Sequence, residues 1–256
     1  MEPRTRATPL TRQLESLYRR LLDAYGPQGW WPTPSRAGAR GFTERGYHPG
    51  EYGGPRAPRE RFEIIVGAIL TQNTAWTNVE KALTRLREAG IFRPADVLAV
   101  PTSRLAGLIR ASGYFNQKAR KLKGVAALFS ADRALAPRAA PTRDDLLAQW
   151  GVGPETADSI LLYAFRVPVF VVDAYTRRLI ERVGLDVPTD HYDEIQQAFH
   201  GSLSPRHELY NEFHALIVAH AKVHCRAKPV CEGCPVSRCR YRDSHRGNGP
   251  RDSARA

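Results

Sequence analysis

The stretch LLAQWGVGPETADSILLYAFRVPVFVVDAYT, residues 146–176, decides the fold. Its apolar residues recur at helical spacing on both sides of Gly151-Val152-Gly153, which predicts helices over residues 143–150 and 156–165 joined by a sharp turn. Glycine can adopt the positive φ that a sharp reversal needs, and Pro154 suits the first position of the second helix. The turn leaves free N–H groups at the start of that helix, so it is either a phosphate site or an ordinary turn between helices.

The remainder of the chain predicts an all-α protein of two helical lobes with a cleft between them. The β-branched residues 169–172 favour a strand by composition, but they have no evident partner strand, so we expect an extended segment. Residues 26–59 are rich in Gly, Pro and Arg, which indicates a functional loop or partial disorder, and Trp30-Trp31-Pro32 favours the loop. Further helices are expected at 12–25, 62–70, 76–89, 101–111, 116–129, 174–183, 192–200 and 205–224.

Charge and cysteine content restrict the partners and the compartment. The 256 residues include 38 Lys and Arg against 26 Asp and Glu, a net charge of +12. This excess suits a polyanion such as double-stranded DNA, although a solvated basic surface has the same composition. No apolar run reaches membrane-spanning length, and no signal peptide is evident. All four cysteines lie within residues 225–239, so we expect a reducing, cytoplasmic setting rather than a disulfide framework.

The hairpin, the Pro-containing segment after it and Asp173 occur in an order that resembles the endonuclease III (helix-hairpin-helix-GPD) superfamily of DNA glycosylases. The resemblance covers about residues 60–240. It implies that Gly151, Val152 and Gly153 grip the DNA backbone and that Asp173 is the catalytic carboxylate. A carboxylate there can stabilise the positive charge that builds on the sugar when an N-glycosidic bond breaks. Asp173 also suits the N-cap of the next helix, whose N-terminus favours the ionised form.

The four cysteines have the pattern Cys225-x5-Cys231-x2-Cys234-x4-Cys239. From the spacing alone, four thiolates can hold either a zinc ion or a [4Fe–4S] cluster. In the endonuclease III superfamily a four-cysteine cluster loop follows the last long helix, as it does here, so the resemblance favours the [4Fe–4S] cluster. The two outer gaps are each one residue shorter than is usual in that family. We expect a structural, DNA-facing role for the cluster.

Glu155 stands where bifunctional members of the superfamily carry a lysine, two residues after the second hairpin glycine. A carboxylate cannot form a Schiff base, so the covalent lyase reaction lacks its nucleophile. Glu155 is also a plausible first-turn acid that complements the helix dipole. Either interpretation predicts a monofunctional glycosylase that uses water.

Four segments resemble the 3-methyladenine DNA glycosylase branch: Trp30-Trp31-Pro32, residues 70–74, residues 112–119 and Gly153-x-Glu155-x-Ala157-Asp158. The resemblance implies that Trp30, Trp31 and Pro32 line a pocket for an extruded purine, with Trp76 stacked on its opposite face. A methylated purine is cationic and stacks well on indole. Core packing is the alternative role for Trp76. Gln72 and Asn73 are at the position where the family inserts a wedge into the gap left by the flipped base. Tyr114 and Asn116 are predicted to contact the DNA strand, and Lys222 is predicted to approach either the base pocket or a phosphate.

The sequence therefore favours a monomeric, monofunctional glycosylase for alkylated purines. The alternatives are an endonuclease III-like glycosylase and lyase for oxidised pyrimidines, and a non-catalytic helix-hairpin-helix DNA-binding protein. We expect four segments: an N-terminal helix and aromatic loop (1–60), a helical domain with the hairpin at 143–165 and the aspartate loop (61–185), C-terminal helices with the cluster loop (186–240), and a disordered tail (241–256).

Overall fold

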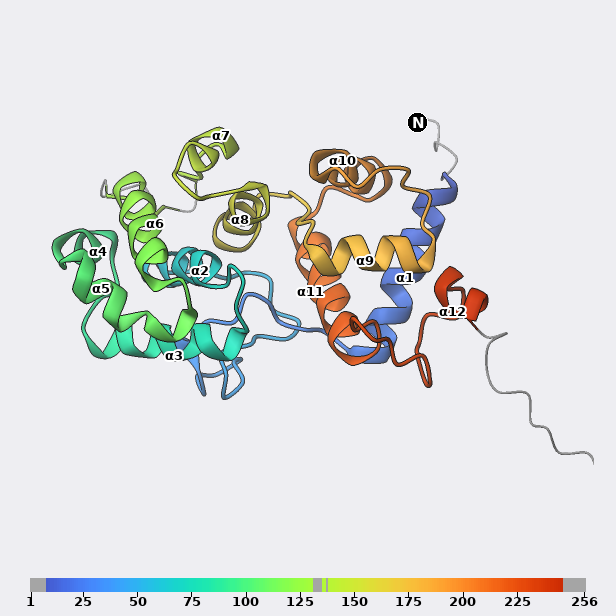
Figure 1. Ribbon diagram of the computed structural model, residues 1–256, viewed down its shortest axis with the longest axis horizontal. Helices are drawn as coiled ribbons and strands as arrows, with labels where there is room; N and C mark the ends of the chain where they lie inside the picture. The colour runs from blue at the N-terminus through green and yellow to red at the C-terminus, as the bar shows by residue number, and fades with distance from the viewer. Residues whose placement is uncertain (1–7, 131–134, 137, 246–256) are drawn as a thin grey trace, which may run out of the picture. The chain divides into compact units, whose positions relative to one another are not determined.

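The computed structural model describes residues 8–130, 135–136 and 138–245, which form helices and connecting loops without any strand (Figure 1). This confirms the all-α prediction, including the extended segment at 169–172. No helix among these residues is long and apolar enough to cross a membrane. The helices are α1 (Pro9–Tyr25), η1 (Pro34–Arg36), α2 (Pro58–Leu70), α3 (Trp76–Glu88), α4 (Pro94–Ala99), α5 (Thr102–Leu108), η2 (Arg110–Ser112), α6 (Phe115–Leu128), α7 (Arg143–Leu147), α8 (Pro154–Ser159), the π-helix η3 (Ile160–Ala164), α9 (Ala174–Val183), α10 (Tyr192–Ser202), α11 (His207–Val223) and α12 (Arg240–His245).

The chain forms two compact units, each built from segments that are distant in the sequence. Unit 1 contains Met1–Pro27, Val172–Ser204 and Phe213–Ala256, and unit 2 contains Gln28–Val171 and Pro205–Glu212. The aromatic loop, the hairpin and the first residues of α11 therefore belong to unit 2. Asp173 and the four cysteines belong to unit 1.

Helix α2 is the central element of unit 2. Of its residues 61–70, all except Glu63 are buried, as expected of a largely apolar helix that is enclosed by others. Helices α3, α6, α8 and η3 contact it. The end of α2 is fixed by Lys118 of α6, which is 1% exposed and donates hydrogen bonds to the carbonyl oxygens of Leu70 (2.8 Å) and Ser112 (2.6 Å).

The hairpin has the predicted place but not the predicted geometry. Helix α7 ends at Leu147, three residues before the expected end, and α8 begins at Pro154. Gly151 has φ +76°, whereas Gly153 is extended at φ −98° and ψ 177°, so only the first glycine is needed for its conformation. Arg143 joins the two helices through hydrogen bonds of 2.9 and 3.2 Å to the fully buried carboxylate of Asp158.

Unit 1 is built around the apolar side of α1 and the later part of α11. Leu14, Leu17 and Leu21 recur at helical spacing on α1 and are all buried. Phe213 of α11 packs edge-on against Tyr18, with ring centroids 5.4 Å apart, and lies 6.0 Å from Phe199 of α10.

Two expectations about secondary structure were wrong. Helix α4 was not predicted, and the helix expected at 101–111 divides into α5 and η2. Residues 241–245, expected to begin a disordered tail, belong to α12, which contacts α9 and places Tyr241 beneath Arg182 at 5.1 Å. The rest of the predicted tail, residues 246–256, lies outside the described residues.

Candidate functional site

Asp173 caps the N-terminus of α9, and both of its carboxylate oxygens have partners. Oδ1 accepts hydrogen bonds from the backbone N–H (2.8 Å) and the hydroxyl (3.0 Å) of Thr176. Oδ2 lies 3.5 Å from Nε2 of His214, a residue of α11 in the same unit. Burial raises the pKa of Asp173, but the hydrogen bond and charge of His214 together with the two Thr176 hydrogen bonds outweigh it, so the pKa is lowered. The side chain is 12% exposed, so an ionised carboxylate remains accessible at the start of the helix.

The hairpin in unit 2 is joined to the predicted wedge loop by polar contacts. Gln72 donates through Nε2 to the carbonyl oxygen of Gly151 (3.2 Å) and to Oγ1 of Thr156 (2.9 Å). Its Oε1 accepts a 2.5 Å hydrogen bond from Lys121, whose side chain crosses Gly151 so closely that a Cβ there would lie 2.4 Å from Lys121 Cε. Gln72 therefore fixes the hairpin, while its neighbour Asn73 is exposed and holds φ +53°.

The other predicted strand contacts of unit 2 lie on its surface. Tyr114 is 64% exposed with φ +45°, and Asn116 is exposed on the first turn of α6. Glu155 is exposed in the first turn of α8. Lys222 is exposed on the part of α11 that belongs to unit 1 and does not line the aromatic cavity of unit 2 described next.

Unit 2 contains an aromatic cavity of about 330 Å³. Trp30, Trp31 and Tyr163 form its aromatic wall, with the ring centroid of Tyr163 lying 6.1 Å from Trp30 and 5.0 Å from Trp31. Trp31 can lie against α2 because residue 67 is glycine, where a Cβ would be 2.9 Å from Trp31 Nε1. Charged side chains such as Arg40, Arg166 and Glu51 line it as well, so the cavity has the size and the mixed lining that suit a planar ligand with polar edges, such as a nucleobase.

Two of the predicted pocket residues have another position. Pro32 is buried and does not line the cavity. Trp76 is also absent from the cavity wall, because its ring packs edge-on against Trp31 with centroids 5.4 Å apart. Trp76 thus supports Trp31 instead of facing it across the cavity.

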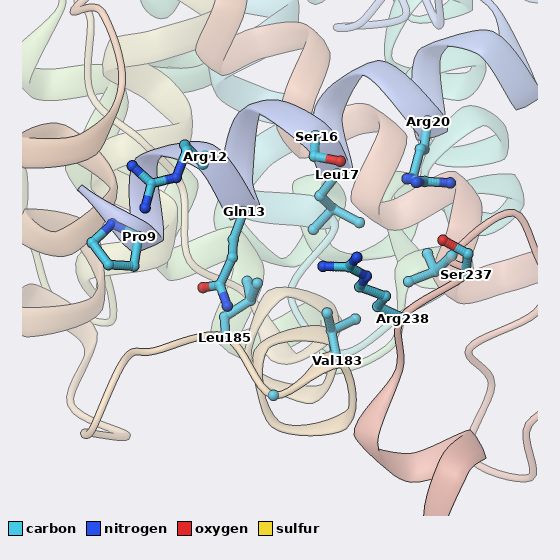
Figure 2. Close-up of a pocket in the computed structure, with 12 residues that line it drawn as sticks. Pro9, Arg12, Gln13, Ser16, Leu17, Arg20, Val183, Leu185, Ser237 and Arg238 are labelled. Atoms are coloured by element: carbon cyan, nitrogen blue, oxygen red, sulfur yellow. The ribbon is translucent and has the colours of Figure 1, made fainter. Parts of the chain in front are cut away.

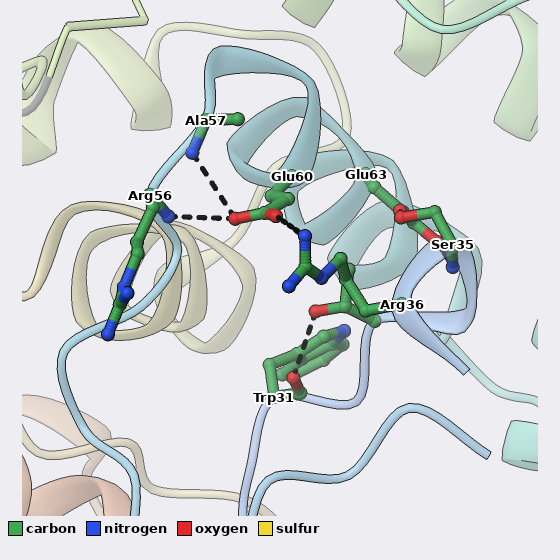
Figure 3. A network of polar contacts seen from close by, with 8 residues as sticks. Trp31, Ser35, Arg36, Arg56, Ala57, Glu60 and Glu63 are labelled. Atoms are coloured by element: carbon green, nitrogen blue, oxygen red, sulfur yellow. Dashed lines mark hydrogen bonds and ion pairs between the residues drawn. The ribbon is translucent and has the colours of Figure 1, made fainter. Parts of the chain in front are cut away.

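Figure 3 shows the polar network at one side of this cavity. Glu60 accepts hydrogen bonds from the backbone N–H groups of Arg56 (2.8 Å) and Ala57 (3.2 Å), and it lies 3.5 Å from the guanidinium of Arg36. Next to it, Glu63 accepts from the N–H and the hydroxyl of Ser35. Glu60 and Glu63 of α2 therefore hold the loop that follows Trp31 at two places, at residues 35–36 and again at residues 56–57.

The first residues of α11 anchor the same loop. Glu212 is fully buried and accepts hydrogen bonds from the backbone N–H of Gln28 (2.7 Å) and the hydroxyl of Tyr52 (2.6 Å). Burial raises the pKa of Glu212, although these hydrogen bonds oppose it. Asn211 donates through Nδ2 to the carbonyl oxygen of Trp30 at 2.9 Å. These contacts explain why a long segment without regular structure has one defined conformation.

The four cysteines of unit 1 are free thiols that line a single cavity between α9, the end of α11 and α12. Arg182 of α9 lies with Nη1 3.4 Å from Cys225 Sγ, and the Cys239 thiol donates to the carbonyl oxygen of Arg182 at 3.2 Å. The four thiols line one small cavity of about 20 Å³, but the described residues contain no group of three or more Cys, His, Asp or Glu side chains arranged to hold a metal ion.

A second cavity of unit 1, of about 540 Å³, lies between α1, the end of α9 and the cysteine loop (Figure 2). Arg12 and Arg20 of α1 and Arg238 of the cysteine loop line it. Its wall contains no acidic residue, so it adds to the basic surface expected from the composition.

Sequence reasoning missed His214, Lys121 and Asn211. His214 and Asn211 contact residues far away in the chain, and a helix pattern identifies neither partner. Only the position of Lys121 gave a weak indication, because it lies two residues after the segment 112–119 that resembles the 3-methyladenine DNA glycosylase branch.

Known proteins support a common origin for this arrangement. The family described as "HhH-GPD superfamily base excision DNA repair protein" matches residues 66–205. A Methanocaldococcus jannaschii protein named as a DNA repair glycosylase (MJ1434) is 40% identical over 227 residues, covering 86% of this chain and 92% of that protein. Endonuclease III of Sulfolobus acidocaldarius is 32% identical over 187 residues, covering 72% and 83%.

Solved structures agree with the sequence matches. The H. pylori 3-methyladenine DNA glycosylase MagIII, bound to 1,N6-ethenoadenine, matches with 30% identity and a TM-score of 0.62, over 83% of this chain and 95% of that one. A trapped endonuclease III–DNA covalent intermediate shares the fold, with a TM-score of 0.68, 22% identity, and coverage of 92% and 98%.

Proposed function

Because the chain belongs to the HhH-GPD superfamily and is a DNA glycosylase of base excision repair, we propose that it hydrolytically releases alkylated purines such as 3-methyladenine. The observation that carries this proposal is the aromatic cavity of unit 2, walled by Trp30, Trp31 and Tyr163. The similar MagIII structure is bound to a modified purine, which supports a purine as the ligand. The substrate is a damaged base flipped out of double-stranded DNA.

Stacking provides the recognition in this proposal. A purine methylated at a ring nitrogen is electron-poor and cationic, and it stacks on indole and phenol rings with a cation–π component. Its glycosidic bond is already weak, so the enzyme needs to supply little acid catalysis. Arg36 and Glu60 at the cavity already have each other as partners, at 3.5 Å.

Asp173 supplies the negative charge in the reaction. The bond between C1′ and the base nitrogen breaks first, and its electron pair leaves with the base, which neutralises the charge of the methylated purine. The ionised carboxylate stabilises the positive charge left on the sugar until water adds to C1′ and releases a proton to solvent. Because both lone-pair-rich oxygens are held, by Thr176 and His214, the charge is fixed in position before substrate binds.

The proposed enzyme is monofunctional because Glu155 occupies the position of the lyase lysine. A carboxylate lacks the amine that would attack C1′ and form a Schiff base. The hairpin, where a Cβ added at Gly153 would meet nothing within 4 Å, would contact the DNA backbone, and the exposed Asn73, Tyr114 and Asn116 would contact the strand.

We also propose that Cys225, Cys231, Cys234 and Cys239 hold a [4Fe–4S] cluster. When bound, the cluster would stabilise the cysteine loop through its four thiolate bonds and add no step to base release. Arg182 would offset part of the negative charge of the thiolates. A zinc ion would give colourless protein, whereas the cluster would give brown protein with stoichiometric iron and sulfide.

The test uses duplexes that contain 3-methyladenine, 7-methylguanine or thymine glycol, incubated with and without subsequent alkali. We expect release of the methylated purines, strand scission only after alkali, and no protein–DNA adduct on borohydride treatment. Release of thymine glycol with scission in the absence of alkali would instead identify an endonuclease III-like enzyme. Binding without release of any base would identify a non-catalytic DNA-binding protein.

A further inference from the structure

Asn211, a residue of the wall of the aromatic cavity of unit 2, has an unsatisfied acceptor. The residue is 8% exposed and lines the cavity with Trp30, Trp31 and Tyr163. Its Oδ1 is buried, and no described residue donates a hydrogen bond to it. A buried acceptor without a partner is costly and is expected to have one in the functional state.

The orientation of the amide is fixed by its other end. Nδ2 donates to the carbonyl oxygen of Trp30 at 2.9 Å, and a carbonyl oxygen can only accept. The opposite orientation would place two acceptors against each other. The free group of Asn211 is therefore the amide oxygen, and its partner must be a donor.

A base that stacks on the aromatic wall directs its edge, not its face, toward the rest of the cavity. Hydrogen bonds to a stacked base lie in the plane of the ring. The donor that reaches Oδ1 would therefore be an N–H group on the edge of the purine. In 3-methyladenine this is the exocyclic N6 amino group, and in 7-methylguanine it is the N1–H or the N2 amino group.

We propose that Asn211 reads the flipped base, selecting purines that carry an N–H donor on the edge facing Oδ1. This inference rests on the proposed function, because it assumes that a purine occupies the aromatic cavity. It assigns recognition of the base edge to a residue that also anchors the Trp30 loop. Binding of the correct base then satisfies an acceptor that the free protein leaves buried and unpaired.

The experiment compares release of two bases by three proteins in single-turnover assays. The bases are 3-methyladenine, which has an amino donor, and 1,N6-ethenoadenine, whose etheno bridge removes the N–H groups from that edge. The proteins are wild type, Asn211→Leu, which removes the acceptor, and Asn211→Asp, which keeps an acceptor oxygen but loses the hydrogen bond to Trp30. Thermal melting checks the folding of each variant.

We expect Asn211→Leu to lower the ratio of the 3-methyladenine rate to the 1,N6-ethenoadenine rate by about tenfold. Asn211→Asp should slow release of both bases by loosening the loop, and it should keep the ratio at or above that of wild type. Glu212→Gln, which disturbs the same loop without touching Oδ1, should leave the ratio unchanged. If Asn211→Leu does not fold, Asn211→Ala, which also removes the acceptor, takes its place in the same comparison with the same expected loss of the ratio.

An unchanged ratio in Asn211→Leu, or a collapsed ratio in Asn211→Asp, would show that Asn211 only anchors the loop and would overturn the inference. In that case release of 3-methyladenine by wild type would still support the proposed function. If wild type releases neither base, the proposed function fails and the inference fails with it.

Discussion

The two hairpin glycines should respond differently to alanine, although they are two residues apart. Gly151 has φ +76°, and a Cβ there would lie 2.4 Å from Lys121 Cε. Alanine costs about 1–2 kcal/mol in this left-handed conformation. It would also displace Lys121 and weaken the 2.5 Å hydrogen bond to Gln72. Since 1 kcal/mol shifts Tm by roughly 2–4 °C in a chain of this size, we expect Gly151→Ala to lower Tm by about 2–8 °C.

Gly153→Ala is the matched variant. Gly153 is extended, and an added Cβ would meet nothing within 4 Å, so alanine fits and should leave Tm unchanged or slightly raised. The open space there is available for a DNA phosphate, and the added methyl group would occupy it. A hydrogen bond to a charged group contributes about 1.5–3 kcal/mol, so DNA affinity should fall by roughly ten- to a hundredfold.

Thermal melting and equilibrium binding to a duplex with an abasic-site analogue, at one fixed salt concentration, measure both effects. Wild-type affinity in Gly153→Ala would refute the role of this turn in phosphate binding. A large loss of Tm in Gly153→Ala would refute the distinction between the two glycines.

Three further predictions concern His214, Lys118 and Cys234. His214→Leu should raise the pKa of Asp173 and move the acid limb of the rate–pH profile to higher pH. His214→Gln keeps a hydrogen-bond donor and should shift that limb less. Acid limbs at the same pH in wild type and His214→Leu would contradict this prediction. Burial lowers the pKa of Lys118 to about 8, so the unfolded state binds more protons than the folded state between pH 8 and 10.5, and the free energy of unfolding should rise with pH there. Lys118→Met should abolish that rise. Because it leaves two carbonyl oxygens unpaired, it should also lower the free energy of unfolding measured in urea by about 2–4 kcal/mol. A variant whose free energy of unfolding depends on pH as in wild type would contradict the prediction. Cys234→Ser should lose brown colour and iron and lower Tm, and an unchanged visible spectrum would argue against the cluster.

Local signals in the sequence predicted the parts of the site that depend on local structure. Helix α9 begins and ends at the predicted residues, because an Asp N-cap and a C-terminal glycine define both ends. The position of the hairpin followed from its glycines and Pro154 for the same reason. The conformation of Gly153 did not, because glycine permits an extended conformation as readily as a left-handed one.

Contacts between distant residues were not predictable in this way. Trp76 carried an aromatic signal that fits either a pocket or a core, and its packing against Trp31 is decided by tertiary structure. Asn211 and Trp30 are 181 positions apart, so no helical period or motif relates them. The same applies to α12, which is stabilised by contact with α9 and not by its own short sequence.

The central claim is that the carboxylate of Asp173 stabilises the sugar cation during hydrolytic release of an alkylated purine. The most direct measurement is the single-turnover rate of 3-methyladenine release by wild type and Asp173→Asn, alongside their affinities for undamaged duplex. Asparagine can still cap α9 while removing the charge. The account predicts that the rate falls by at least about a hundredfold while affinity stays within a few-fold. A variant that releases the base at the wild-type rate would contradict it.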